Sequence, residues 1–116
     1  MNFFRLGCFF SLLCVVASAA GAHLLSAAEL QGGFDAGLRQ HAIHGLALLI
    51  VGLKQPSNRM QKSAGWLFVV GILLFSCVLY LRTLTGIRDL AIITPIGGVS
   101  FMLGWLCLML SKVPKK

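Results

Sequence analysis

Charged residues are scarce in this sequence, and acidic residues are nearly absent. Only 11% of the 116 residues are charged, and Asp and Glu together number 3. A soluble globular domain carries about 25% charged residues, because water must wet its surface. The shortage therefore excludes an ordinary water-soluble domain, and the 58% of hydrophobic residues indicates a lipid environment. The net charge of +7 is explained by where the basic residues lie along the chain, so nucleic acid is not expected as a partner.

Metal-binding and catalytic motifs are also missing. No H-E-x-x-H pattern occurs, and no nucleophile stands beside an evident base. Ser76 and Ser100 lie within apolar runs, where we expect each hydroxyl to bond the backbone of its own helix. The cysteines form no CxxC pair and are interpreted as small core residues; they are Cys8, Cys14, Cys77 and Cys107. The sequence thus disfavours an enzyme, and neither a metal nor a cofactor is expected.

What the sequence does contain is a series of long apolar runs. We place spans at about residues 5–24, 36–54, 63–82 and 92–112, each close to the roughly 20 residues that an ~30 Å hydrocarbon layer requires. Hydrocarbon offers backbone groups no hydrogen-bond partner, and the runs lack the alternation of barrel strands, so the spans are expected to be helices. The prediction is an all-α fold: a four-transmembrane-helix bundle forming a single integral membrane domain over residues 1–116.

The connecting segments differ sharply in charge. Those before the first span, between the second and third, and after the fourth contain no acid and hold seven of the basic residues: Arg5, Lys54, Arg59, Lys62, Lys112, Lys115 and Lys116. The other connections balance Arg39, Arg82 and Arg88 against Glu29, Asp35 and Asp89. By the positive-inside rule, both the N and C termini are predicted to be cytoplasmic.

Two local features leave alternatives open. The apolar run that ends in Ala17-Ser18-Ala19 also resembles a secretory signal with an A-x-A cleavage site, and cleavage after residues 1–19 would leave three spans. Thr94 and Pro95 are interpreted as the N-cap and the first residue of the fourth helix. Alternatively, a helix that starts near Leu90 would be kinked at Pro95.

Several sequence pieces along most of the chain match the pattern of a known family. They are Gly21-Ala22-His23, His44 with Leu46-Ala47-Leu48-Leu49, the stretch Gly71 to Leu81, Thr94-Pro95-Ile96-Gly97-Gly98, and Phe101-Met102-Leu103-Gly104-Trp105. With these pieces the chain resembles the YgdD-like family of small four-helix bacterial inner-membrane proteins, whose function is unknown. Cys77, Leu24 and Gln40 depart from the pattern of that family. The resemblance implies a multi-pass protein of the bacterial inner membrane and no particular activity.

A candidate polar site lies within the membrane. Ionisable groups in a span are costly and suggest function, so the candidates are His23, His41 and His44, together with Gln40 and Arg39. His41 and His44 are three residues apart and share a helix face. The predicted topology puts all three histidines in the outer part of the bundle. An imidazole there could relay a proton, bind a metal, or form a hydrogen bond between helices.

Small residues suggest where helices approach closely. The packing and motif candidates are Gly21, Thr94, Pro95, Gly97, Gly98, Gly104 and Trp105. The leading hypothesis is a structural or accessory membrane component, self-associating through the glycine-lined fourth helix. Its expected partners are the lipid bilayer and a homo-oligomer or other membrane proteins. The alternative is a carrier or binder of a proton, a metal ion or a small amphiphile that uses the outer histidines.

Overall fold

The computed structural model describes residues 2–54 and 58–112, and every regular element in these ranges is helical. The α-helices are α1 (Phe3–Leu24), α2 (Ala27–Glu29), α3 (Asp35–Leu53), α4 (Arg59–Gly71), α5 (Cys77–Thr85) and α6 (Thr94–Leu110). Two π-helical segments, η1 (Leu30–Phe34) and η2 (Ile72–Ser76), join α2 to α3 and α4 to α5, and the 3₁₀ segment η3 (Arg88–Ile92) precedes α6. The prediction of an all-α fold is confirmed.

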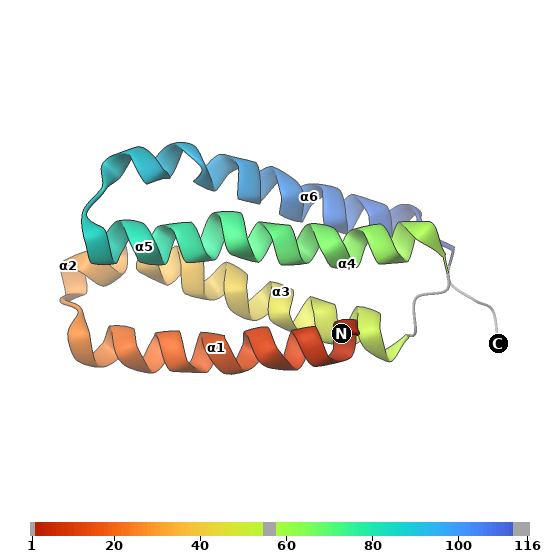
Figure 1. The fold of residues 1–116 in the computed structure, drawn as a ribbon, viewed down its shortest axis with the longest axis horizontal. Helices are drawn as coiled ribbons and strands as arrows, with labels where there is room; N and C mark the ends of the chain where they lie inside the picture. Colours follow the sequence, from red (N-terminus) through yellow and green to blue (C-terminus); the bar gives the residue numbers. More distant parts are fainter. Residues whose placement is uncertain (1, 55–57, 113–116) are drawn as a thin grey trace.

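Four long rods result from these elements, as predicted. They are Phe3–Leu24, Ala27–Leu53, Arg59–Thr85 and Arg88–Leu110, each long and apolar enough to cross a bilayer. The rods run alternately up and down, so the beginning of α1 and the end of α6 lie at the same end of the bundle (Figure 1). The bundle is 50 Å long, so its ends reach beyond an ~30 Å hydrocarbon layer.

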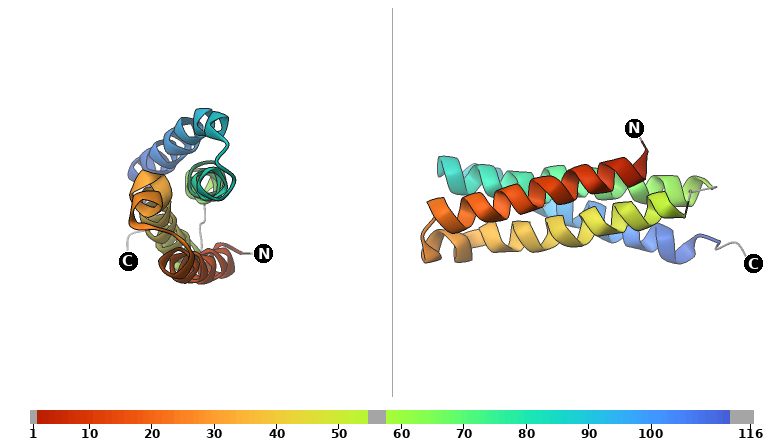
Figure 2. Two further views of the ribbon diagram at one scale, coloured as in Figure 1. Left: turned by 90° about the vertical axis from the view of Figure 1, so that its left-hand side faces the viewer. Right: turned by 90° about the horizontal axis from the view of Figure 1, so that it is seen from below.

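The rods are arranged as two antiparallel pairs. α1 packs along α3, and α6 packs along α4, while α3 also contacts η2 and α4 in the centre (Figure 2). Glycine permits the approach in the first pair, because a Cβ added to Gly7 would lie 2.6 Å from the backbone nitrogen of Leu49. In the second pair, a Cβ on Gly97 would lie 2.5 Å from the backbone nitrogen of Phe75.

Polar side chains begin several of the helices. The side chain of Asn2 accepts a hydrogen bond from the Arg5 backbone N–H at 2.8 Å, and that of Asn58 accepts one from Gln61 at 2.9 Å. Ser26 and Glu29 form a reciprocal capping box with bonds of 3.2 and 3.0 Å. These caps satisfy amides that the first turn of a helix leaves unpaired.

The second rod begins earlier than the predicted span at residue 36. The capping box starts helical structure at Ala27, and Gly33, with φ of 130°, then redirects the chain into α3. Only glycine adopts that backbone conformation without strain. The third rod also extends past its predicted span, from Arg59 to Thr85.

Thr94 is not the N-cap of the fourth helix, so that expectation is wrong. α6 continues from η3, Ile93 has helical backbone angles, and Thr94 is itself helical. Its Oγ1 is buried and has no hydrogen-bond partner among the described residues. Pro95 is tolerated in this first turn because its missing N–H falls where few intrahelical bonds are made.

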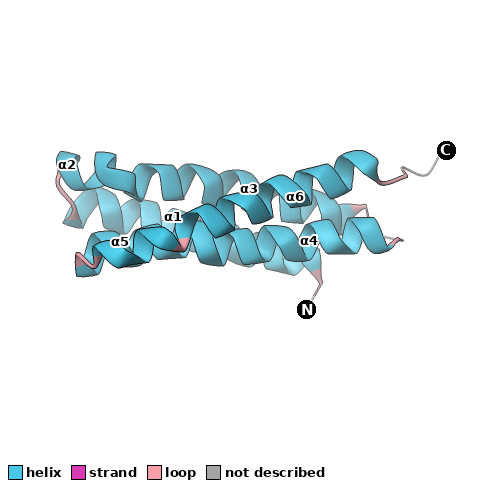
Figure 3. Ribbon diagram, turned by 90° about the horizontal axis from the view of Figure 1, so that it is seen from above, coloured by secondary structure: helices cyan, strands magenta, loops and turns pink. Residues whose placement is uncertain are grey.

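Apolar side chains occupy both the interior and the exterior of the bundle. Phe68, Leu48 and Ile72 are fully buried at its centre, whereas Val15, Leu46 and Met109 are exposed. Helices make up nearly all of the described chain, with short loops at the two ends (Figure 3). An apolar exterior on an apolar core is the pattern expected when lipid is the solvent.

Candidate functional site

The structure brings some of the predicted polar residues together and leaves others apart. His41 and His44 lie on the buried face of α3, and each is 2% exposed. Gln40 is half-buried beside them, whereas Arg39 is exposed on the same helix. His23 is exposed in the last turn of α1. The candidate site therefore centres on His41, His44 and Gln40.

Both ring nitrogens of His44 have partners within the protein. The indole Nε1–H of Trp105 on α6 donates to His44 Nε2 at 2.9 Å. His44 Nδ1 lies 2.7 Å from the backbone oxygen of Gln40. An indole nitrogen can only donate, so Nε2 must accept, and Nδ1 must carry the proton that is donated to the Gln40 oxygen. The contacts fix one neutral tautomer of His44.

Aromatic rings from the second helical pair surround His44. The Phe101 ring is stacked on the imidazole, with centroids 3.6 Å apart and planes at 12°. The Phe68 and Trp105 rings lie at 5.3 and 5.8 Å. His44 is about 13 Å along α3 from Asp35 and about 15 Å from Lys54. It thus lies near the middle of α3, as the count of residues from Asp35 predicts.

His41 is less completely bonded. Its Nδ1 lies 2.8 Å from the hydroxyl oxygen of Tyr80 on α5, and Tyr80 in turn packs against Phe34 with ring centroids 4.9 Å apart. Among the described residues, His41 Nε2 makes no hydrogen bond of good geometry, although the backbone of Phe10 is close enough to interact with the imidazole. The Phe10 ring packs beside the imidazole, with the ring centroids 6.1 Å apart. A buried nitrogen without a partner carries a desolvation cost, and such groups merit a functional explanation.

Comparison with known proteins identifies the family. The profile of DUF423, a family described as a protein of unknown function, matches residues 17–98. A UPF0382 membrane protein of Staphylococcus haemolyticus is 36% identical over 113 residues, which cover 94% of this chain and 93% of the relative. The UPF0382 membrane protein YwdK of Bacillus subtilis is 35% identical over 117 residues, 96% and 95% of the two chains. The chain belongs to the DUF423 family.

The comparisons confirm the broad expectation of a membrane protein family of unknown function, under the labels DUF423 and UPF0382 rather than YgdD-like. No solved structure matches the chain. The DUF423 profile covers His41, His44 and Tyr80, while Phe101 and Trp105 lie beyond its last matched residue.

Two serines of this DUF423 member hold neighbouring helices together. Ser76 Oγ donates to the backbone oxygen of Gly37 on α3 at 2.7 Å, and Ser100 Oγ donates to that of Leu67 on α4, also at 2.7 Å. The expectation that both would bond their own helices is wrong. Tyr80, the partner of His41, was not among the residues predicted for the site, because the two residues are 39 positions apart and no local pattern connects them.

The glycine candidates fall into two groups. A Cβ on Gly21 would lie 2.6 Å from the Phe34 ring, one on Gly104 2.6 Å from the Phe68 ring, and one on Gly97 2.5 Å from the Phe75 backbone. At Gly98 the nearest atom would be 3.8 Å away, in the Phe75 ring. Gly97 and Gly104 are thus occupied by contacts within the bundle, and their face of α6 is not free for self-association.

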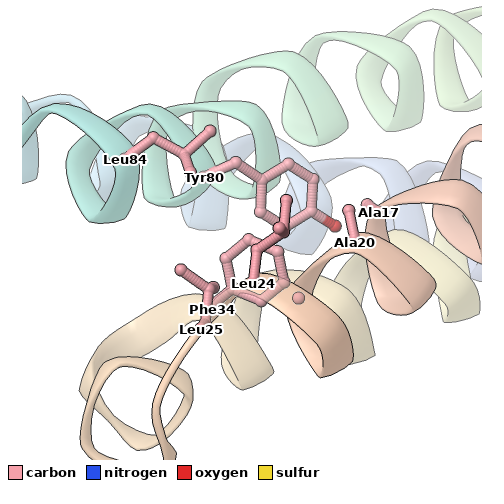
Figure 4. Close-up of a pocket in the computed structure, with 8 residues that line it drawn as sticks. Ala17, Ala20, Leu24, Leu25, Phe34, Tyr80 and Leu84 are labelled. Carbon is pink, nitrogen blue, oxygen red and sulfur yellow. The ribbon is translucent and has the colours of Figure 1, made fainter.

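The arrangement in pairs leaves openings between the rods, and two of them lie near the candidate site. One, of about 190 Å³, lies between α1 and α5, where Ala17, Ala20 and Leu24 face Tyr80 and Leu84 (Figure 4). It is apolar throughout. The other, of about 260 Å³, lies between α3 and α6 and includes Gln40, Gly98 and Trp105. We call it the α3/α6 hollow.

The ring nitrogens of the two buried histidines are mostly engaged by protein groups. Within residues 2–54 and 58–112, no three His, Cys, Asp or Glu side chains gather as a set of metal ligands. His44 has both nitrogens engaged, and His41 offers one. What the arrangement can do is bond helices to one another and hold a single imidazole nitrogen in a dry interior.

Proposed function

We propose that this chain is a structural or accessory component of the bacterial inner membrane, crossing it several times and catalysing no reaction. The observation that supports this most is the bonding of His44. An imidazole with both nitrogens held by protein groups and one face stacked on Phe101 is built to join helices. A ligand or a proton would have to displace one of these partners.

The distribution of charge supports an orientation with both ends in the cytoplasm. The end of the bundle where α1 begins carries Arg5, Lys54, Arg59, Lys62 and Lys112, and no acid among the described residues. Glu29, Asp35 and Asp89 all lie at the opposite end. The basic end is the one that the positive-inside rule assigns to the cytoplasm.

Replacing His44 by Leu tests the structural role. The variant leaves the indole N–H of Trp105 without an acceptor, so the free energy of unfolding should fall by about 1–3 kcal/mol. Reversible unfolding in mixed detergent micelles measures it. Insertion into the membrane should remain normal, since leucine is favoured there.

Trp105→Phe is the matched control, because it removes the donor of the same hydrogen bond. In the double variant with His44→Leu, the loss should be smaller than the sum of the two single losses, because both substitutions remove one shared interaction. Additive losses would argue against the bond. If His44→Leu changes neither stability nor any transport or binding, neither role for His44 survives.

A second candidate function is the handling of a proton, or of a small amphiphile with a hydrogen-bonding group. The observation that favours it is the unpartnered Nε2 of His41, on a ring whose other nitrogen bonds Tyr80. Tyr80 also lines the apolar opening between α1 and α5 (Figure 4). A path from that opening to His41 would pass the tyrosine hydroxyl.

A further inference from the structure

The α3/α6 hollow differs from the opening between α1 and α5 in containing polar residues, Gln40 and His44. Its walls include the rings of Phe75, Phe101 and Trp105, and Met102 flanks it. Gly98 leaves space in its wall, since the nearest atom to an added Cβ is 3.8 Å away. Gln40 also lines it.

The Gln40 amide has no hydrogen bond within the described part of the chain. It is half-buried on a span and makes no bond to any described residue, whereas nearby His44, Ser76 and Ser100 are all bonded. Gln40 is about 7.5 Å along α3 from Asp35, so it lies within the outer acyl-chain region when Asp35 is at the headgroups. Lipid tails offer an amide neither a donor nor an acceptor.

We propose that the α3/α6 hollow is the contact surface for a second copy of this chain, with the two Gln40 amides bonded to each other. An amide carries both an acceptor oxygen and donor N–H groups, so two of them satisfy one another reciprocally. Two copies inserted in the same direction are related by a two-fold axis along the membrane normal. A residue near that axis meets its own counterpart at the same depth.

The remaining surface fits the same occupant. Met102 is 64% and Trp105 44% exposed beside the amide, and they supply apolar area around it. The opening between α1 and α5 has no polar lining, so an acyl chain is sufficient to fill it. This interface deepens the proposed structural role and rests on it, but association and bundle stability are measured separately.

Cysteine crosslinking in native membranes tests the interface. Gln40→Cys should give a disulfide-linked dimer of twice the chain mass on oxidation, well above the background from the natural cysteines of the unsubstituted protein. Ala19→Cys is the matched control, because Ala19 is exposed on α1 and lies five residues from Leu24, as Gln40 lies five residues from Asp35. The crosslinking of the Ala19→Cys variant should stay at the background level of the unsubstituted protein.

A second measurement avoids the added cysteine. Energy transfer between labelled copies in dilute phospholipid vesicles should show that Gln40→Leu weakens dimerisation by roughly 3- to 10-fold. Gln40→Asn, which keeps an amide, should weaken it less. The unfolding transition of both variants should match that of the unsubstituted chain.

Three results would refute the proposed interface. They are equal crosslinking of the cysteine variants at residues 19 and 40, crosslinking of Gln40→Cys only to a different protein, and unchanged dimerisation of Gln40→Leu. None of them bears on the His44 measurement, so the structural role could stand without the dimer.

Discussion

His41 and His44 share one face of α3 but differ in how many ring nitrogens have partners. His44 is bonded at both, and His41 at one among the described residues. Buried polar groups in proteins are nearly always bonded, so the Nε2 of His41, like the buried hydroxyls of Ser11 and Thr94, calls for an explanation. Sequence spacing placed both residues on one face, yet it could not distinguish them.

Proton handling at His41 can be tested in vesicles that contain the purified chain and a pH-sensitive dye. If the second candidate function holds, the unsubstituted chain should dissipate an imposed pH gradient faster than empty vesicles do. Both His41→Leu and Tyr80→Phe should slow that dissipation, because each removes one group of the bonded pair. His23→Leu, at an exposed position away from the pair, should not. An unsubstituted chain that leaves the gradient as intact as empty vesicles rules the candidate out.

Helix packing in this chain depends on single glycines at defined positions. Gly97 and Gly98 are neighbours in α6, but only Gly97 faces the backbone of η2. In lipid, close packing contributes to helix association because burial of apolar surface gives little driving force there. The contribution of a small residue is therefore set by the atoms opposite it.

Substitution of the two neighbouring glycines by alanine should affect the free energy of unfolding differently. Gly97→Ala should destabilise the bundle by about 1–3 kcal/mol, because backbone atoms 2.5 Å from the new Cβ must move. Gly98→Ala should be neutral or stabilising by up to about 1 kcal/mol, since alanine is the better helix former and the space is open. Unfolding in mixed micelles measures both. Equal losses at the two positions would contradict the packing.

Much of the element structure could be predicted from the sequence, because span length and loop charge are local properties. The start of the second rod was missed, since Ser26 and Glu29 were not recognised as a capping box ahead of Gly33. Thr94 carried a valid N-cap signal that η3 overrides by continuing the helix. The bond between His44 and Trp105 joins residues 61 positions apart, so it depends on how α3 and α6 are placed and has no local signal.

The whole molecule consists of two helical pairs that are joined by polar bonds and apolar packing. α1 packs along α3 and α6 along α4, whereas polar bonds connect one pair with the other: His41 with Tyr80, Ser76 with Gly37, and Trp105 with His44. Buried apolar side chains from both pairs, among them Leu48 and Phe68, form one central core. Each pair begins and ends at the same end of the bundle.

The membrane orientation is tested by reporters inserted at the two ends. Alkaline phosphatase at Gln31, in η1, should be active, and a fluorescent protein at Gln55, which is outside the described residues, should fluoresce. The reason is that basic connections are retained in the cytoplasm. Reporters found in the same compartment would refute the four-span orientation, and release of the chain by alkaline carbonate would refute integration itself.

The pairing also has a consequence for biogenesis. α1 and α3 leave the ribosome first and complement each other, so the amino-terminal half can enter the bilayer as a hairpin while the rest is still being synthesised. α4 to α6 can then follow as a second hairpin, because α6 packs along α4. Since the indole of Trp105 comes from the last rod, its bond to His44 can form only when both hairpins have docked, which makes that contact a marker of completed assembly.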